Sequence, residues 1–209
     1  MTVAMERVAP RWQGECCIVA ASGPSLTAET AEACRGDHVI AVCDAYRRVT
    51  FAEVLYASDA RWWDHHGDCS AFAGEKWSAH NARGNDKTRQ AEKYGLRLVA
   101  GEDGRGFSLD PERIHYGKNS GFQAVNLAIL FGAVRIVLVG FDMHGTHFFG
   151  AHPKPLRNTT SFAAYIEQFE IAAKRLPRHV EIVNATPGSA LKCFPFVDLG
   201  MGVSEAKAA

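Results

Sequence analysis

The sequence predicts one α/β domain, in which a mainly parallel sheet is covered by helices on both faces. Two observations carry this prediction. Short runs rich in Val, Ile, Leu and Ala alternate with helical patterns along the chain, which is the order expected of strands joined by crossover helices. Several of these runs are apolar at every position, as in strands that are buried on both faces of a parallel sheet. With 209 residues, the chain is long enough for one substantial core and gives no reason to divide it into two domains.

The stretch 119–143 lies at the centre of this prediction. Asn119 or Ser120 can cap the start of a helix, and only two polar residues interrupt the apolar run that follows. Gly132 stands where a left-handed C-terminal cap is expected. Because a helix this apolar has to be covered on most sides, we expect it to lie in the middle of the core.

Five apolar runs are predicted to be strands of the sheet, and residues 96–99 are a weaker candidate. The five are residues 16–21, 38–43, 54–57, 135–140 and 180–183. Small or acidic polar residues follow four of them, namely Ser22, Asp44, Ser58 with Asp59, and Asp142. The carboxyl ends of parallel strands meet at one edge, where open α/β sheets bind ligands. The set therefore indicates a ligand crevice, although each residue alone can equally cap the next helix.

The turn at 22–26 is the first candidate for phosphate binding. Gly23 permits a tight turn, Pro24 fixes φ, and Ser25 or Thr27 can cap the following helix. Backbone N–H groups and a helix dipole at one point suit a phosphate. The turn has neither the G-x-G-x-x-G fingerprint nor the lysine of a Walker loop, so a plain strand-to-helix turn is an equal alternative.

The loop that follows Asp142 carries the most chemically versatile side chains. They are His144, His147, His152, Lys154 and Arg157. A histidine suits a general base because its unperturbed pKa lies near neutrality, and lysine and arginine suit the charge of a leaving phosphate. One alternative is a solvent-exposed loop without chemistry. A metal site formed by Asp142 with the three histidines is a weaker alternative.

The remaining regions are less informative. The aromatic residues at 61–66 indicate a helix packed on the core rather than a base-stacking shelf. Residues 67–115 are rich in Gly, Asp, Arg and Lys, and such an irregular segment is typical of a lid or an acceptor-binding loop. We expect residues 1–14 to be a flexible arm, 15–203 to be the domain, and 204–209 to be a disordered tail.

Composition excludes several classes of protein. Lys and Arg together equal Asp and Glu at 23 each, so no global basic field indicates nucleic-acid binding. No apolar run is long enough to span a membrane, and the first residues lack the layout of a secretion signal. The six cysteines show no C-x-x-C spacing. These features predict a cytoplasmic protein without a structural metal; a homo-oligomer is compatible with them.

Three motifs, in this order along the chain, resemble those of a known family. They are I-V-A-A-S-G-P-S-L at 18–26, N-S-G at 119–121 leading to G-F-D-M at 140–143, and N-A-T-P-G-S-A-L at 184–191. The chain is similar to the small bacterial sialyltransferases that use CMP-sialic acid, to motility-associated glycosyltransferases and to hydroxymethylpterin diphosphokinases. It also looks like uncharacterised proteins of bacteriophages. The resemblance implies a single Rossmann-like, nucleotide-binding domain.

The resemblance also implies roles for particular residues. The nucleotide is expected at Ser22, Gly23, Pro24, Ser25, Asp44, Asn119, Ser120 and Gly121. The general base is a histidine of the loop, with His152 the nearest match by position and His147 the next. The family's paired tyrosines, which help to neutralise the leaving phosphate, have no counterpart in the sequence.

The leading hypothesis is therefore a glycosyltransferase that moves a sugar from a nucleotide-sugar donor to an acceptor hydroxyl. Ser58 and Asp59 are added to the nucleotide site from their place after a strand, Lys154 and Arg157 are expected at the leaving group, and no cofactor is required. The acceptor stays open: a glycan, a lipid, a modified nucleobase in DNA, or a small molecule. One alternative is Mg²⁺-dependent pyrophosphoryl transfer, with Asp44, Asp59 and Asp142 as metal ligands. Another is a non-catalytic nucleotide-binding accessory protein.

Overall fold

The parallel sheet predicted from the sequence is the frame of the molecule. The structure is a computed structural model that describes residues 4–200 except 82, 84–85, 155 and 157–160. These residues form one eight-stranded sheet with the strand order β6-β5-β4-β3-β2-β1-β7-β8, in which each described pair of neighbours is parallel. The predicted fold class is confirmed.

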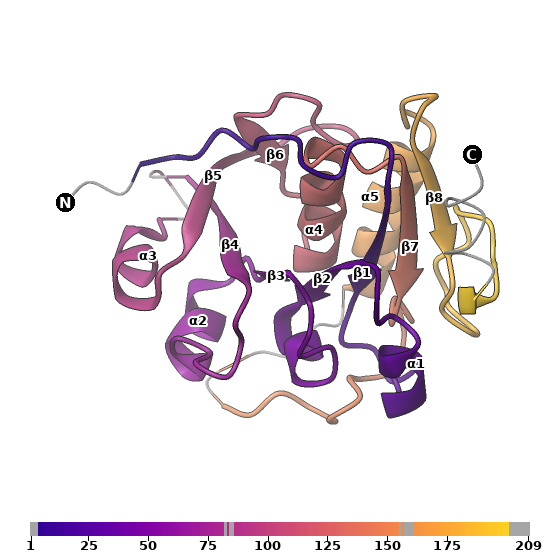
Figure 1. Ribbon diagram of the computed structural model, residues 1–209, viewed down its shortest axis with the longest axis horizontal. Helices are drawn as coiled ribbons and strands as arrows, with labels where there is room; N and C mark the ends of the chain where they lie inside the picture. Colours follow the sequence, from indigo (N-terminus) through magenta and orange to yellow (C-terminus); the bar gives the residue numbers. More distant parts are fainter. Residues whose placement is uncertain (1–3, 82, 84–85, 155, 157–160, 201–209) are drawn as a thin grey trace.

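The elements alternate between strand and helix along most of the chain (Figure 1). The strands are β1 Cys16–Ala20, β2 His38–Val42, β3 Val54–Tyr56, β4 Glu75–His80, β5 Arg97–Glu102, β6 Arg113–His115, β7 Arg135–Val139 and β8 Glu181–Asn184. The helices are α1 Ala28–Glu32, the 3₁₀ helix η1 Cys43–Arg47, α2 Ala60–His66, α3 Thr88–Tyr94, α4 Ser120–Leu130 and α5 Phe162–Ala173.

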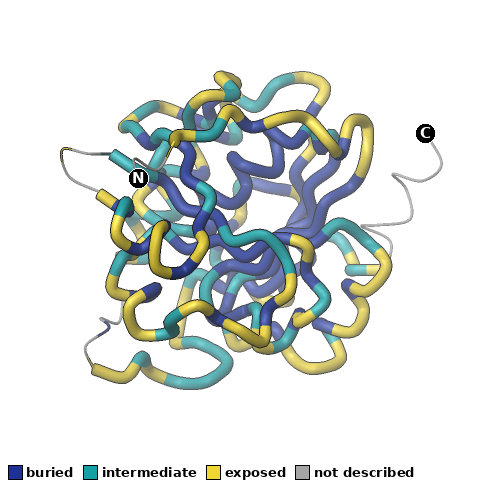
Figure 2. Tube along the Cα trace, turned by 60° about the vertical axis from the view of Figure 1, so that its left-hand side comes forward, coloured by how far each residue is buried: buried dark blue, intermediate teal, exposed yellow. Residues whose placement is uncertain are grey.

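Two apolar layers cover the two faces of the sheet. On one face, α4 and α5 pack against alternate strand residues such as Val19 and Ile40. On the other face, α1, α2 and α3 pack against the intervening residues, such as Ile18 and Ala41. Figure 2 shows the strands as the buried centre and the exposed segments at the periphery. Strands buried on both faces explain why the apolar runs show no polar alternation.

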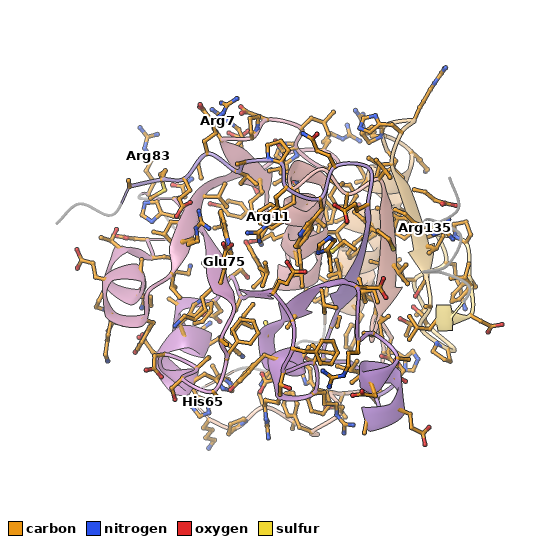
Figure 3. The ribbon with its side chains drawn as sticks, viewed as in Figure 1. Arg7, Arg11, His65, Glu75, Arg83 and Arg135 are labelled. Atoms are coloured by element: carbon orange, nitrogen blue, oxygen red, sulfur yellow. The ribbon has the colours of Figure 1, made fainter. Side chains whose placement is uncertain are left out.

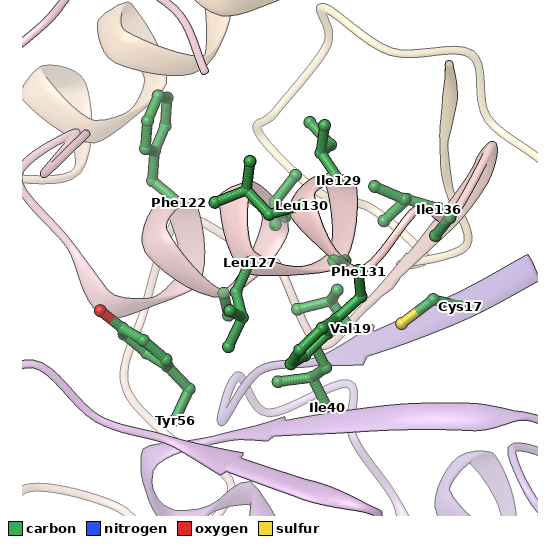
Figure 4. Packing of buried hydrophobic residues seen from close by; sticks show 14 of the residues in the cluster. Cys17, Val19, Ile40, Tyr56, Phe122, Leu127, Ile129, Leu130, Phe131 and Ile136 are labelled. Atoms are coloured by element: carbon green, nitrogen blue, oxygen red, sulfur yellow. The ribbon is translucent and has the colours of Figure 1, made fainter. Parts of the chain in front are cut away.

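Helix α4 is the central element of the first layer, as its sequence predicts. Figure 4 shows Leu127 on the side of the helix that faces Val19 and Ile40 of the sheet, whereas Phe122 projects from the opposite side. Asn119 provides the N-cap, accepting a hydrogen bond from the N–H of Phe122 at 2.9 Å, and Gly132 adopts the expected positive φ of 95°. The two polar residues inside the helix are structural. Gln123 Oε1 accepts a hydrogen bond from the Tyr56 hydroxyl (2.7 Å), and Asn126 Oδ1 accepts one from the N–H of Ser108 (2.8 Å).

The segment 67–115 differs most from the sequence-based expectation. The prediction of a lid or acceptor loop is wrong, because this segment supplies β4, β5, β6 and α3. The weak candidate at 96–99 is part of β5, whereas β4 and β6 were not predicted. Strand β4 reads Glu-Lys-Trp-Ser-Ala-His and β6 is three residues long, so neither shows an apolar run. Pairing with neighbouring strands decides their conformation more than their own sequence does.

The amino-terminal segment packs against the domain, in contrast to the flexible arm that we expected. Trp12 is buried, and its N–H donates to the carbonyl oxygen of Phe131 at 2.8 Å. The Arg11 guanidinium forms an ion pair with Glu75 at 2.9 Å, and Figure 3 shows these two side chains next to each other. The described part of the segment, residues 4–14, therefore has no regular secondary structure but is held in place.

The strand order contains one switch point. From β1 the chain proceeds outward through β2, β3, β4, β5 and β6, then returns to place β7 on the other side of β1. The connections after β1 and β7 thus leave from adjacent strands at the carboxyl edge, where a crevice forms in folds of this type. In the part of the chain that the structure describes, no helix is long and apolar enough to cross a membrane.

Candidate active site

A pocket lies at the switch point of the sheet. Its walls come from the ends of β1, β2 and β7, from the N-terminus of α4, from the loop after β7 and from the start of α5. The lining residues are Ala21, Ser22, Gly23, Val42, Cys43, Asn119, Gly121, Gly140, Phe141, Asp142, Met143, His144, Thr146, His147, His152, Phe162 and Tyr165. Eight residues singled out from the sequence therefore meet in one place: Ser22, Gly23, Asn119, Gly121, Asp142, His144, His147 and His152.

Backbone strain is concentrated around this pocket. Cys43 and Met143 both line it, and they have positive φ values of 49° and 55° although neither is glycine. Lys118, directly before Asn119, has a φ of 63°. Such conformations cost on the order of 1 kcal/mol or more each and cluster at functional sites. The strained residues thus support the pocket as the candidate site.

The turn at 22–26 is held by Asp142. The Asp142 carboxylate accepts a hydrogen bond from the N–H of Ser25 (3.2 Å) and another from its hydroxyl (2.8 Å). Gly23 packs directly against the same carboxylate, since a Cβ at Gly23 would lie 1.9 Å from Asp142 Oδ2 and 2.4 Å from the Gly140 carbonyl oxygen. Only glycine fits at position 23, because the Asp142 carboxylate and the Gly140 carbonyl occupy the space that a side chain would need. Any larger residue, such as valine in a Gly23→Val variant, would displace the turn.

Three backbone N–H groups of this turn, those of Gly23, Ser25 and Leu26, are used inside the protein. Gly23 N–H donates to Gly140 (3.0 Å), Leu26 N–H donates to Gly23 (3.1 Å), and the N–H of Ser25 is taken by Asp142. Pro24 has no N–H and does not line the pocket. These three groups therefore do not contribute to the phosphate cradle that we expected. The first residues of the turn, Ser22 and Gly23, form a pocket wall.

The motif at 184–191 also has a structural role. Thr186 Oγ1 accepts a hydrogen bond from the N–H of Phe141 (3.0 Å), and Ser189 Oγ donates to the Phe141 carbonyl (2.5 Å). The N–H of Ala190 donates to the Asp142 carbonyl at 2.8 Å. The motif therefore fixes the path of the chain after β7, and with it the carboxylate that holds the turn.

Two of the loop histidines, His147 and His152, lie together in a group of aromatic rings. The rings of His147 and His152 are 4.3 Å apart between centroids, and Phe149 stacks on His147 at 4.9 Å with an interplanar angle of 7°. His147 Nδ1 lies 3.3 Å from the Gly150 carbonyl oxygen, which can only accept, so this nitrogen carries the proton. In neutral His147 the lone pair is then on Nε2, the atom that can act as a base.

Burial keeps both histidines neutral. It lowers the pKa of His147 and of His152 below the usual value for histidine, and for His152 the charge of a protonated His147 acts in the same direction. The negative charge of Asp44 acts in the opposite direction on both. Neutral imidazoles near pH 7 can accept a proton, which is what a general base has to do.

Several predicted residues lie outside the pocket lining. Asp59 caps α2 by accepting from the N–H of Arg61 (2.8 Å), and Ser58 and Ser120 bond to each other through their hydroxyls (2.8 Å). Lys154 is exposed, and Arg157 lies outside the described residues.

Among the residues that the structure describes, no group of three or more His, Cys, Asp or Glu side chains could hold a metal ion, so Asp142 and the three loop histidines do not form the metal site weighed above.

Asp44 is buried beside the pocket rather than in it. Its carboxylate accepts a hydrogen bond from the indole N–H of Trp62 (2.8 Å), and it lies 3.5 Å from both Arg47 and His66. Only 2% of the residue is exposed, which leaves little of it available to a nucleotide.

Sequence reasoning missed several lining residues. Cys43 and Met143 lie beside predicted residues at strand ends, and their strained backbone has no signature in the sequence. Burial raises the pKa of Cys43 to about 12, so its thiol is not a nucleophile near neutral pH. Tyr165 on α5 also lines the pocket, which gives the site one phenol that the motifs did not indicate.

Structures of known proteins share this fold. No protein-family model and no curated protein sequence matches the chain. The MAf glycosyltransferase from Magnetospirillum magneticum AMB-1 matches with a TM-score of 0.65 and 11% identity, over all of this chain and 38% of that one. The chain thus spans well under half the length of that protein.

The sialyltransferase CstII from Campylobacter jejuni matches as well. In complex with cytidine 5′-monophosphate it gives a TM-score of 0.54 at 14% identity, over 90% of this chain and 87% of that one. In complex with a trisaccharide acceptor and CMP it gives 0.52 at 14% identity, over 88% and 86%. These likenesses bear out the resemblance to sialyltransferase-like glycosyltransferases that the motifs indicated. At such low identity they show that the chain has the α/β fold of these glycosyltransferases.

Proposed function

We propose that this chain is a glycosyltransferase whose switch-point pocket binds a nucleotide-sugar donor. One observation carries the proposal: the pocket brings two half-buried histidines, His147 and His152, to the same crevice as the N-terminus of α4. A base and a phosphate-binding helix end are the two elements that sugar transfer from a nucleotide requires.

The phosphate of the donor is assigned to the start of α4. The first N–H groups of a helix have no acceptor inside it, and the helix dipole adds positive potential there. Asn119 and Gly121 line the pocket at this end, while the N–H groups of Gly23, Ser25 and Leu26 in the turn are engaged within the protein. The glycosyltransferase donor therefore lies across the ends of β1 and β7 with its phosphate at α4.

The reaction follows from this placement. The imidazole of His152 or His147 takes the proton of the acceptor hydroxyl as its oxygen bonds to the anomeric carbon of the sugar. The bond between that carbon and the phosphate oxygen breaks, and the nucleotide leaves with the bonding electrons. The proton on the histidine then passes to solvent. The donor in this proposal is a nucleoside monophosphate sugar, since none of the described lining residues is a lysine or arginine that could balance a diphosphate. CstII, which has a similar fold, binds CMP.

No observation favours Mg²⁺-dependent pyrophosphoryl transfer over this proposal. That reaction needs Asp44, Asp59 and Asp142 to converge on a metal ion. Instead, each carboxylate is engaged by a different group: Trp62 for Asp44, the start of α2 for Asp59, and Ser25 for Asp142.

The test is a thermal-shift screen with CMP, UDP, GDP, ADP and ATP, each with Mg²⁺ and with EDTA. Stabilisation follows occupancy, so CMP or another nucleotide should raise the melting temperature without metal. Stabilisation by ATP only with Mg²⁺ would favour the pyrophosphoryl alternative. No stabilisation by any nucleotide would contradict the donor site.

A matched pair of variants locates the phosphate. Asn119→Asp retains a cap acceptor for α4 but places a negative charge at the pocket, and it should weaken nucleotide binding by about tenfold or more. Asn119→Ser also retains the cap and adds no charge, so its affinity should change much less. If the two variants bind the nucleotide with equal affinity, the phosphate does not lie at the start of α4.

A further inference from the structure

Asp44 forms the centre of a second polar group that adjoins the pocket. The carboxylate is fixed by the Trp62 indole, whose ring stacks on His66 at a centroid distance of 4.2 Å. His66 Nε2 and the Arg47 guanidinium each approach Asp44 Oδ1 at 3.5 Å. A carboxylate this deeply buried is costly unless it is partnered, and these three side chains are its partners.

A chain of contacts leads from Asp44 to the loop histidines. The Arg47 guanidinium lies over the ring of Phe149 at 5.7 Å, and that ring stacks on His147 and lies 5.2 Å from the ring of His152. The neighbouring Arg48 lies over Phe148 at 4.5 Å. Helix η1 and the residue after it therefore hold the loop through two cation–π contacts.

We propose that Asp44 is a positioning residue for the loop histidines. It fixes Arg47, which holds Phe149 against His147 and His152, and it supplies the negative charge that balances the proton one of these histidines accepts. As a role in catalysis this inference rests on the proposed function. As a statement about the loop it stands on the contacts alone.

The titratable groups around Asp44 support this role. The groups whose ionisation it influences are Cys43 and Tyr46 on η1, His66 on α2, Cys69 after α2, and His147 and His152 on the loop. Burial raises the pKa of Cys43 and of Tyr46 to about 12 and that of Cys69 to about 11, so all three stay neutral near pH 7. The histidines are then the groups that titrate, and protonated His65, His66 and His147 all disfavour a proton on His152. Asp44 opposes them.

The test is to measure the pKa of each histidine by NMR titration in wild type and in Asp44→Asn, a variant that can still accept from Trp62. The pKa values of His66, His147 and His152 should fall by about 0.5 unit or more, because an opposite charge is lost. Arg47→Gln removes a positive charge that lowers the pKa of His66, so in that variant the His66 value should rise. It should also shift the resonances of His147 and His152, since Phe149 loses its contact with Arg47.

Asp64→Asn is the control. Asp64 lies on the same helix as His66, but its carboxylate bonds to Gln90 and Tyr94, both at 3.1 Å. This variant should leave the histidine titrations unchanged. If Asp44→Asn does not fold, Arg47→Gln decides. Unchanged pKa values and resonances of all three histidines in the variant that folds would overturn the proposal.

A kinetic measurement separates this inference from the proposed function. The acidic limb of the pH profile of kcat/KM should move to lower pH in Asp44→Asn, with the donor Kd little changed. Shifted titrations in a protein without transferase activity would refute the function and leave the positioning of the loop in place. Unshifted titrations in an active enzyme would refute the positioning alone.

Discussion

Histidines at the two edges of the sheet have opposite environments. At the amino edge, His38 Nδ1 lies 2.6 Å from Glu53 and Nε2 lies 3.0 Å from Glu15, and the ring stacks on Trp12 at 4.9 Å. Both nitrogens need a proton to satisfy two carboxylates, so the ring is an imidazolium. Although burial opposes it, the two carboxylates raise the pKa of His38 above its usual value.

At the carboxyl edge, the effect of burial on the histidine pKa exceeds the effect of nearby negative charge. His147 and His152 are surrounded by aromatic rings, and burial lowers the pKa of each. The role of a histidine therefore depends on its surroundings. Two carboxylates turn one into a structural cation, whereas burial keeps the others neutral and fit to accept a proton.

The largest expected effect is on turnover. Replacing His147 and His152 together by alanine should lower kcat by about 100- to 10,000-fold, because the proton acceptor is lost, with little change in donor Kd. Steady-state kinetics and donor titration would measure the two quantities. Full activity of the double variant would show that the histidines at the carboxyl edge do not act as the base.

His38→Gln serves as the matched replacement at the amino edge. It lies at the opposite end of the strands from the pocket, so kcat should stay within about twofold of wild type when the protein is folded. A loss of turnover comparable to that of the double variant would mean that the assay reports stability rather than chemistry.

The next effect concerns the turn that Asp142 holds. Gly23→Ala should lower the free energy of unfolding by about 2 kcal/mol or more, since the added Cβ overlaps the Asp142 carboxylate and the Gly140 carbonyl. Gly200→Ala is the control, because a Cβ there meets nothing within 4 Å. Equal urea midpoints for the two variants would show that the turn is not closely packed.

A smaller effect should appear at the amino edge. Because its folded-state pKa is raised, His38 stabilises the fold below its unfolded pKa of about 6.5, and this contribution is lost as pH rises through the folded value. His38→Gln should therefore be less stable than wild type by about 1 kcal/mol at pH 6 and close to it at pH 9. Urea unfolding at both pH values measures this, and a difference that grows with pH would contradict it.

The smallest effect is expected at Lys154. Its side chain is exposed and outside the pocket lining, so Lys154→Ala should weaken donor binding by only about two- to threefold. Calorimetric titration at low and high salt would check it. A much larger loss would place Lys154 at the donor phosphate when the ligand is bound.

The sequence predicted the fold well where buried strands are apolar on both faces, as in 16–21 and 135–140. The sequence did not predict β4, which contains several polar residues, or β6, which is three residues long. The conformation of such strands depends mainly on their neighbours in the sheet. Within the site, residues at strand ends were found because parallel strands gather their carboxyl ends. The partners of those residues were not found: no local pattern reveals that Asp142 binds Ser25 or that Trp62 binds Asp44, since each contact joins distant segments.

The most direct test of the central claim is an NMR titration of the wild-type protein, with His38, His147 and His152 assigned by single glutamine variants. His147 and His152 should titrate below the free value of about 6.5, and their resonances should shift when the stabilising nucleotide is added. His38 should titrate above that value and be insensitive to the nucleotide. If His147 and His152 titrate above the free value, or if no nucleotide perturbs them, then the loop histidines are not the neutral base of a donor site.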